Sequence, residues 1–252
     1  MTLLKAEGIT KRFPGVVALA KVNLTIQPGE VHCIVGENGA GKSTLVKILT
    51  GLYKPDEGTL TVEENAIAYV PQEINLFDHL SVAENIMMPL DGRGQVFFNR
   101  RQCERDALKF MSELQMESDP SALVKSISVA EKQLLQIARA LANSAFKLLI
   151  LDEPTASLTK REIEKLFGVL DALKAQGKSI IFITHRLDEV MRLHDQVTVL
   201  RNGEVVGHSK GQQIDEEWIV RQMTGKDIDL EALYRPTVPA GDVLLDVQGL
   251  TG

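Results

Sequence analysis

A glycine-rich segment at residues 36–44 could bind the phosphates of a nucleotide. It reads Gly-Glu-Asn-Gly-Ala-Gly-Lys-Ser-Thr and fits the pattern G-x-x-x-x-G-K-[ST]. Glycines allow the backbone to curl so that its N–H groups surround phosphate oxygens. Lys42 would neutralise the β- and γ-phosphates, and the Ser43 hydroxyl would be a ligand of Mg²⁺. The residues expected to contact the nucleotide here are Gly36, Asn38, Gly39, Ala40, Gly41, Lys42, Ser43 and Thr44.

The residues on either side of this segment support the same interpretation. An apolar strand is expected at Val31–Val35, and the helix after the loop would carry Leu45, Ile48, Leu49 and Leu52 on one face. A phosphate-binding loop requires a strand before it and a helix after it. The alternative is an ordinary glycine-rich turn, which does not account for the lysine and the serine together with this context.

A second apolar strand ends in two carboxylates. Leu148–Leu151 is an unbroken apolar run, and Asp152 and Glu153 follow it directly. The carboxyl end of a parallel strand lies at the edge of the sheet where the phosphate-binding loop also lies. There Asp152 would hold the Mg²⁺ shell through water, and Glu153 could orient or deprotonate the attacking water. The alternative is that Asp152 and Glu153 are merely the solvated end of a strand. The apolar character of the strand before them argues against that alternative.

A third apolar strand, Ile180–Ile183, is followed by Thr184 and His185. His185 would lie beside the γ-phosphate and could donate a hydrogen bond to it. A single histidine at a strand end is more often structural than catalytic. The prediction therefore depends on its position on the strand next to the one that carries Glu153.

The elements that must position these side chains alternate between strand and helix. Strands are expected at residues 31–35, 66–70, 148–151 and 180–183. The helix before the last strand would begin at a capping box of Thr159 and Glu162. A strand, a helix and a strand in this order predict a right-handed crossover in a parallel sheet. We therefore expect an α/β fold, a P-loop NTPase core with a mainly parallel sheet.

Two other regions depart from this alternation. The N-terminal residues and the turn at Asn202-Gly203 predict an antiparallel β region. Residues from about 81 to 145 are mainly helical in pattern and predict an inserted α-helical subdomain.

Composition excludes several classes of protein. The net charge of −6 argues against a nucleic-acid partner. The two cysteines, Cys33 and Cys103, have no neighbours at metal-ligand spacing. No apolar run approaches the length of a membrane-spanning helix, and no signal sequence is evident. We therefore expect a soluble, cytoplasmic chain that leaves any membrane crossing to other chains.

Taken together, these motifs resemble those of the ATPase domains of ABC transporters. Lys42, Gln72, Ser128, Asp152-Glu153 and His185 occur in the family's order. The resemblance covers residues from about 3 to 230. It implies that ATP and Mg²⁺ are bound, that Gln72 approaches the metal and the attacking water, and that Ser128 contacts the nucleotide of an opposite domain.

The same resemblance implies that Phe13 stacks on the adenine ring. A single aromatic residue is weak evidence, and packing in the core or in a turn is the alternative.

Two positions depart from the common family pattern. The signature, usually Leu-Ser-Gly-Gly-Gln, reads Ile-Ser-Val-Ala-Glu at residues 127–131, and Thr159 stands where Asp is usual. Ser128 and Glu131 also form a capping box, which explains them without a role in ATP binding. These departures resemble the first domain of tandem sugar and autoinducer-2 import ATPases, as does Met-Thr-Gly-Lys at residues 223–226. The interval from Lys42 to Gln72 is shorter than that subfamily leads us to expect.

The end of the chain suggests a further domain. Residues 244–251 repeat the pattern of residues 3–10, after a stretch that reads as a linker. The alternative is two unrelated edge strands of similar composition. We expect an ABC ATPase domain at residues 1–234, a linker at 235–243 and the start of a truncated second ABC domain at 244–252.

The resemblance implies the ATP-hydrolysing subunit of an importer for a sugar or a sugar-like solute. Its partners would be a second ABC domain (in the same full-length chain or as a homodimer), membrane permease subunits and, indirectly, a periplasmic or extracellular solute-binding protein. It would lie on the cytoplasmic side of the inner membrane as a peripheral subunit.

Other functions remain possible on the same motifs. A soluble tandem ABC ATPase acting on ribosomes or DNA would need basic surfaces, but residues 227–246 hold five acidic residues and only Arg235 as a base. A regulatory domain that binds ATP with little hydrolysis fits the altered signature, although Glu153 and His185 argue against it. A GTPase would need an Asn-Lys-x-Asp guanine reader, which the sequence lacks.

Overall fold

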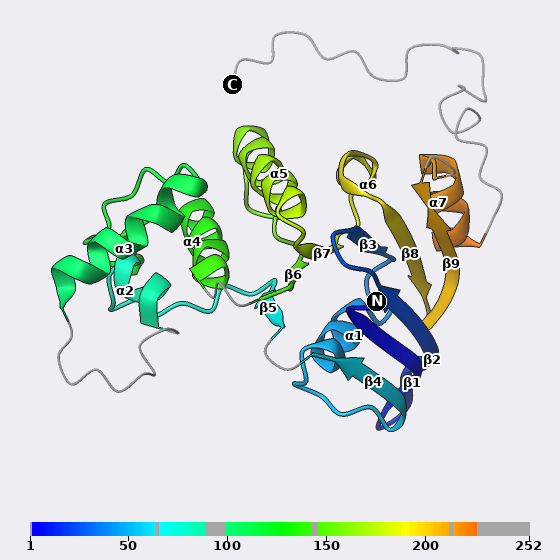
Figure 1. Ribbon diagram of the computed structural model, residues 1–252. Helices are drawn as coiled ribbons and strands as arrows, with labels where there is room; N and C mark the ends of the chain where they lie inside the picture. Colours follow the sequence, from blue (N-terminus) through cyan, green and yellow to red (C-terminus); the bar gives the residue numbers. More distant parts are fainter. Residues whose placement is uncertain (1, 64–65, 89–98, 143–145, 212–213, 226–252) are drawn as a thin grey trace, which may run out of the picture.

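The computed structural model describes residues 2–63, 66–88, 99–142, 146–211 and 214–225. Two sheets and a set of helices make up this part of the chain (Figure 1). The strands are β1 (Leu4–Phe13), β2 (Val16–Ile26), β3 (Val31–Val35), β4 (Glu57–Val62), β5 (Ile67–Val70), β6 (Leu148–Asp152), β7 (Ser179–Ile183), β8 (Gln196–Arg201) and β9 (Glu204–Lys210). The helices are α1 (Lys42–Leu49), α2 (Val82–Met87), α3 (Arg100–Glu113), α4 (Val129–Ala142), α5 (Lys160–Ala175), α6 (Leu187–Leu193) and α7 (Glu216–Thr224), with a short 3₁₀ turn at Val124–Ser126.

The larger sheet confirms the predicted α/β core. Its strand order is β5-β6-β7-β3-β8-β9, and every neighbouring pair is parallel except β8 and β9. Strands β3, β6 and β7 are buried along their whole length, as expected of parallel strands covered on both faces. The strand order places the ends of β3, β6 and β7 side by side, so the loops that follow them meet at one edge.

Each face of this sheet packs on a different layer. On one face, alternate residues such as Cys33, Leu151 and Phe182 join a core with residues from α3, α4, α5 and α7. On the other face, residues such as Ile150 and Ile183 join a second core with α1 and the N-terminal strands. Because strand side chains alternate between faces, a single apolar run supplies both cores.

The smaller sheet is antiparallel, with the order β2-β1-β4, and it confirms the antiparallel N-terminal region. Its inward residues include Leu4, Ile9 and Ile26, which pack on α1. The hairpin of β8 and β9 turns at Asn202-Gly203, as the sequence predicts, and both turn residues have positive φ angles of 50° and 81°.

Helices α2, α3 and α4 pack on one another beside the larger sheet (Figure 1). They occupy the described part of the interval in which an inserted helical subdomain was expected. Helix α4 begins at Ser128 with a capping box, because Ser128 Oγ accepts from the N–H of Glu131 at 3.2 Å and Glu131 Oε2 accepts from the N–H of Ser128 at 3.1 Å.

Helix α1 is shorter than its apolar pattern suggests. Leu45, Ile48 and Leu49 are buried as predicted, but Leu52 is 64% exposed and lies beyond the end of the helix. Gly51 at φ 77° takes the left-handed conformation that ends helices, so Leu52 cannot continue the buried face. The prediction for Leu52 was therefore wrong.

No helix in the described ranges is long and apolar enough to cross a membrane. The predicted linker at 235–243 and the predicted domain start at 244–252 lie outside the described residues.

Candidate functional site

The glycine-rich loop joins β3 to α1 and is shaped by close backbone contacts. A Cβ atom on Gly36 would collide with the carbonyl oxygen of Leu200 at the end of β8. A Cβ atom on Gly41 would lie 2.7 Å from the carbonyl oxygen of Ala18, and Gly41 has a φ of 105°. The loop can take this path only with glycine at these positions, and the path leads directly into the N-terminus of α1.

Lys42 lies at the start of α1 with its amine turned back onto the loop. Its Nζ donates to the carbonyl oxygens of Gly36 at 2.7 Å and Glu37 at 3.1 Å. Burial lowers the pKa of Lys42 from its ordinary value, although the charges of Glu153 and Asp152 act in the opposite direction. The charged form of a buried amine of this kind is stabilised by an anionic partner in the loop.

An open cavity of about 740 Å³ lies against this loop. Predicted site residues make up much of its wall, namely Phe13, Asn38, Gly39, Gly41, Lys42, Ser43, Thr44, Gln72 and Glu153. The remaining lining residues were not predicted from the sequence: Val16, Val17, Ala18, Asn202 and Gly203. The Asn-Gly pair was interpreted only as a hairpin turn, and nothing local indicates that the turn reaches the loop.

The two carboxylates at the end of β6 differ in their position, because Glu153 lines this cavity and Asp152 does not. Asp152 is 3% exposed, and burial raises its pKa to about 6, with the charge of Glu153 acting in the same direction. Glu153 has a φ of 47°, and its N–H donates to the carbonyl oxygen of Ile183 on β7 at 3.0 Å. The two carboxylates therefore diverge, with Asp152 held inside and the Glu153 side chain reaching the cavity wall.

Glu153 brings together the two other predicted catalytic residues. The Gln72 Nε2 atom donates to Glu153 Oε2 at 3.2 Å, and His185 Nδ1 lies 3.2 Å from Glu153 Oε1. Gln72 follows β5, Glu153 follows β6 and His185 follows β7, so the neighbouring strands of the sheet deliver all three. His185 does not line the cavity itself and is connected to it through Glu153.

Phe13 also lines the cavity and is 36% exposed. Its ring meets that of Tyr53 in a T-shaped contact, with 5.8 Å between the ring centroids. The position excludes the alternative of a fully buried core residue. Stacking of Phe13 on adenine stays a prediction.

Ser128 is not part of this cavity. It is exposed at the start of α4, where it bonds to Glu131, and Glu131 also accepts a hydrogen bond from Ser118. These hydrogen bonds, that of Ser118 first, lower the pKa of the Glu131 carboxyl. A role in nucleotide binding would therefore have to be exercised on another domain, and it stays a prediction.

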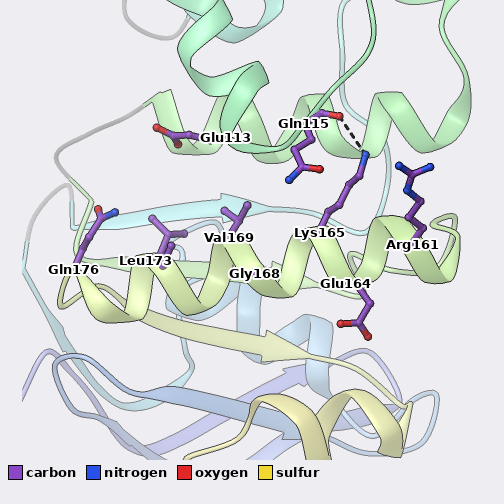
Figure 2. Close-up of a pocket in the computed structure, with 10 residues that line it drawn as sticks. Glu113, Gln115, Arg161, Glu164, Lys165, Gly168, Val169, Leu173 and Gln176 are labelled. Carbon is purple, nitrogen blue, oxygen red and sulfur yellow. Dashed lines mark hydrogen bonds between the residues drawn. The ribbon is translucent and has the colours of Figure 1, made fainter.

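A second hollow of about 660 Å³ lies between the end of α3 and α5 (Figure 2). Figure 2 shows Lys165 reaching from α5 toward Gln115, whose carbonyl oxygen accepts from Lys165 Nζ at 3.4 Å. The other lining residues include Glu113, Arg161 and Glu164, a mixture of charges. None of the predicted site residues is among them, so this hollow marks the boundary between the helical group and α5.

Comparison with protein families gives a match to the ABC transporter family model over residues 19–156. This interval contains Lys42, Gln72, Ser128 and the Asp152-Glu153 pair, whereas His185 lies after it.

Similar curated proteins include the ribose import ATP-binding protein RbsA 3 of Rubrobacter xylanophilus, which is 43% identical over 99% of this chain and 52% of its own length. A protein of Agrobacterium fabrum, named as a candidate ribose/galactose/methyl galactoside import ATP-binding protein, is 42% identical over 99% of this chain and 52% of its own length. The chain thus spans about half the length of the curated relatives that it matches.

Solved structures support the same grouping. The ATP-binding cassette MJ0796, in a dimeric post-hydrolysis state bound to ADP and Pi, has a TM-score of 0.75 and 27% identity, covering 82% of this chain and 98% of that one. The dimeric structure of the same bacterial ABC transporter cassette gives a TM-score of 0.75 at 28% identity, again covering 82% of this chain and 98% of that one. From the loop, the carboxylate pair and these matches, the chain belongs to the ABC transporter family.

Proposed function

We propose that this chain is the ATP-hydrolysing cassette of an importer for a sugar of the ribose or galactoside type. The observation that carries the catalytic part is the meeting of Gln72, Glu153 and His185 beside the cavity of the phosphate-binding loop. The solute class is supported by relatives that are named for ribose and galactoside import.

ATP would lie in the cavity with its phosphates against the loop and the N-terminus of α1. Backbone N–H groups there favour anions. The Lys42 amine, which the loop carbonyls now hold, would move to the β- and γ-phosphates. The exposed face of Phe13, which also lines the cavity, would receive the adenine ring.

The residues present also fit a magnesium ion. Asp152 is a buried carboxyl with a raised pKa, and a neighbouring divalent cation would favour its charged form. The Ser43 hydroxyl and the Gln72 side chain, whose Oε1 atom is an oxygen ligand of the kind Mg²⁺ prefers, line the adjoining cavity. When bound, Mg²⁺ would neutralise phosphate oxygens. Ser43, Gln72 and Asp152 would hold it.

Glu153 would act as the base for the attacking water. It would accept one proton from that water as the oxygen forms a bond to the γ-phosphorus, while the bond to the bridging oxygen breaks and ADP leaves with that electron pair. Its contacts with Gln72 and His185 would fix the orientation of the carboxylate. His185 could then donate a hydrogen bond to the departing phosphate.

The partners of the whole protein follow from the same proposal. A groove of about 520 Å³ between the helical group and the sheet is lined by Tyr69, Pro71 and Arg139 among others, directly beside the segment that holds Gln72. The exposed Leu52 also lines this groove, and the exposed ring of Phe77 lies against the Arg139 guanidinium at 5.5 Å. A permease docked here, on the cytoplasmic side of the membrane, would contact the segment that holds Gln72 and so respond to its movement. A solute-binding protein would act through the permease.

A second ABC domain is the remaining partner. We assign residues 235–243 to a linker and 244–252 to the beginning of that domain, because residues 244–251 repeat the pattern of residues 3–10. Curated relatives about twice as long as this chain support the assignment.

Replacement of Lys42 tests the nucleotide site. Lys42→Ala should abolish ATP binding measured by calorimetry, because it removes the charge that meets the β- and γ-phosphates. Lys5→Ala is the matched control, since Lys5 forms an exposed ion pair with Glu7 and does not line the cavity. Unchanged ATP affinity in Lys42→Ala would contradict the site.

Uptake tests the solute class. Deletion of the gene should abolish energy-dependent uptake of labelled ribose or methyl galactoside by the source cells, and the wild-type gene should restore it, whereas Lys42→Ala should not. Full uptake of both sugars in the deletion strain would exclude the sugar importer while leaving the ATP site intact.

A further inference from the structure

The hairpin turn at Asn202-Gly203 is a wall of the nucleotide cavity that the motifs do not account for. The N–H of Gly203 donates to the carbonyl oxygen of Ala40 in the phosphate-binding loop at 3.0 Å. The carbonyl oxygen of Gly203 accepts from the N–H of Ala20 on β2 at 2.9 Å. The turn is therefore bonded both to the loop and to the N-terminal sheet.

The loop glycines are fitted to this hairpin. A side chain on Gly36 would collide with the carbonyl oxygen of Leu200, the second residue before the turn. A Cβ atom on Gly41 would lie 3.5 Å from the Cα atom of Gly203. A displacement of the end of β8 would thus be transmitted to the loop by direct contact.

Arg201 connects the same turn to the C-terminal helix. It is the last residue of β8 and directly precedes Asn202. Its Nη1 atom donates to the carbonyl oxygen of Gln222 in the last turn of α7 at 2.9 Å. The last carbonyls of a helix lack partners within the helix, and a guanidinium both satisfies one and opposes the negative end of the helix dipole.

Gly225 makes room for this guanidinium. It caps α7 in the left-handed conformation, with a φ of 71°, and a Cβ atom placed on it would collide with Arg201 Nη1. This contact explains why glycine stands at position 225 of the Met-Thr-Gly-Lys segment, which the family resemblance alone does not explain. Helix α7 also packs closely on β9, where a Cβ atom on Gly207 would lie 2.8 Å from Gln222 Cγ (Figure 1).

We propose that Arg201 is a positioning residue for the nucleotide site, which links the end of α7 at Gly225 to the Asn202-Gly203 wall and through it to the phosphate-binding loop. A displacement of the end of α7 at Gly225 would therefore reach the nucleotide through Arg201 and the hairpin turn. This inference rests on the proposed nucleotide site.

Three substitutions in the 252-residue chain test the link, with the Kd for Mg-ATP and for Mg-ADP measured by calorimetry. Arg201→Ala should weaken both affinities by about fivefold to tenfold. Arg201→Lys should restore most of the loss, since the amine can still reach the Gln222 carbonyl. Gly225→Ala should weaken affinity in the same direction by displacing the guanidinium.

The matched control is Arg192→Ala, because Arg192 forms a 2.6 Å ion pair with Asp171 and does not line the cavity. It should bind both nucleotides with the wild-type Kd. Gly225→Ala keeps Arg201 in the chain, so its nucleotide Kd tests the proposal independently if Arg201→Ala does not fold.

The double variant Arg201→Ala/Gly225→Ala separates coupling from general damage. Once the guanidinium is gone, Gly225→Ala should have no further effect on nucleotide affinity, although it still lowers stability. Fully additive losses, or a wild-type Kd in Arg201→Ala, would overturn the proposal. Lys42→Ala tells failure of the nucleotide site from failure of the Arg201 proposal. If Lys42→Ala binds ATP normally, the site itself is wrong. If Lys42→Ala loses binding while the Arg201 and Gly225 variants keep it, only the role of Arg201 is wrong.

Discussion

Glu153 has a backbone conformation that few non-glycine residues adopt. Its φ of 47° lies in the left-handed region, which costs about 1–2 kcal/mol for a residue with a Cβ atom. The hydrogen bond from its N–H to the carbonyl oxygen of Ile183 holds it there. This conformation lets one strand end send Asp152 inward and Glu153 toward Gln72 and His185. Strain retained at such a place is consistent with a functional residue.

We expect Glu153→Gln to separate binding from hydrolysis. The amide keeps the size of the side chain but cannot accept the proton of the attacking water, so turnover of ATP should fall roughly 10²–10³-fold while ATP affinity is retained. The measurement is steady-state ATPase activity of the complex with all its partners, together with calorimetric binding.

The matched control is Glu164→Gln, an exposed glutamate on α5 that lines the second hollow and not the nucleotide cavity. It should hydrolyse ATP at the wild-type rate. If Glu153→Gln also keeps the wild-type rate in the complete complex, Glu153 is not the base at the dominant site.

At the scale of elements, the sequence predicts best where local pattern and tertiary packing agree. Strands β6 and β7 were predictable because each contains an unbroken apolar run covered on both faces, and β3 was predictable from apolar residues at all positions except His32. Helix α5 was predictable at its start, where Thr159 and Glu162 form both hydrogen bonds of the expected capping box. The residues that follow these strands were predictable as candidates for one site, because the carboxyl ends of parallel strands lie at the same edge of a sheet.

The parts that were missed depend on contacts between distant segments. Val16, Ala18 and Asn202 enter the cavity wall because β2 and the β8–β9 turn approach the loop, and neither approach has a local sequence signal. Leu52 fits the apolar period of α1, but the left-handed residue Gly51 ends the helix before it. Local periodicity cannot indicate where a helix stops in relation to its neighbours.

A histidine cluster joins β3, β8 and β9 at the end of the sheet away from the loop. His32 Nε2 lies 2.8 Å from Thr198 Oγ1, which lies 3.2 Å from His208 Nδ1. Burial first, and then the charges of His32 and Lys210, lower the pKa of His208 from its ordinary value of 6.5, while Glu30 acts in the opposite direction.

We expect this cluster to make the chain acid-sensitive. Because the pKa of His208 is lower in the folded state, the unfolded chain binds the proton more tightly, and the free energy of unfolding falls as pH falls through 6.5. Urea unfolding at about pH 7.5 and about pH 5.5 should show a smaller loss in His208→Gln than in the wild type. Replacement of the exposed His79 by Gln is the control, and an equal loss in all three proteins would exclude His208 as the cause.

At the scale of the whole molecule, the two predicted halves of the ATP site lie on different parts of the chain. The loop, Glu153 and His185 gather at the edge of the larger sheet. Ser128 is exposed at the start of α4, which belongs to the helical group beside that sheet (Figure 1). Ser128 therefore does not belong to the cavity of its own phosphate-binding loop, and we expect it to act on the nucleotide of another domain. Dimeric cassettes among the structural neighbours fit that arrangement.

In the full-length protein we expect one fast and one slow ATP site. The fast site would combine this chain's Lys42, Glu153 and His185 with the signature of the second domain. The slow site would be capped by this chain's own α4, where Glu131 occupies the hydroxyl and the N–H of Ser128 and its hydrogen bonds lower the pKa of the carboxyl, which keeps it charged. A carboxylate at a helix N-terminus offsets the positive end of the dipole and repels a γ-phosphate.

Single-turnover kinetics on the full-length protein with its permease would show the two phases. The exposed Val129 side chain, where the family usually has glycine, would crowd the phosphate further. Ser128→Ala should therefore reduce ATP turnover much less than Glu153→Gln, because it alters only the slow site. Two kinetically equivalent sites, or equal damage from the two substitutions, would show that the altered signature still serves hydrolysis and that the sites are not asymmetric.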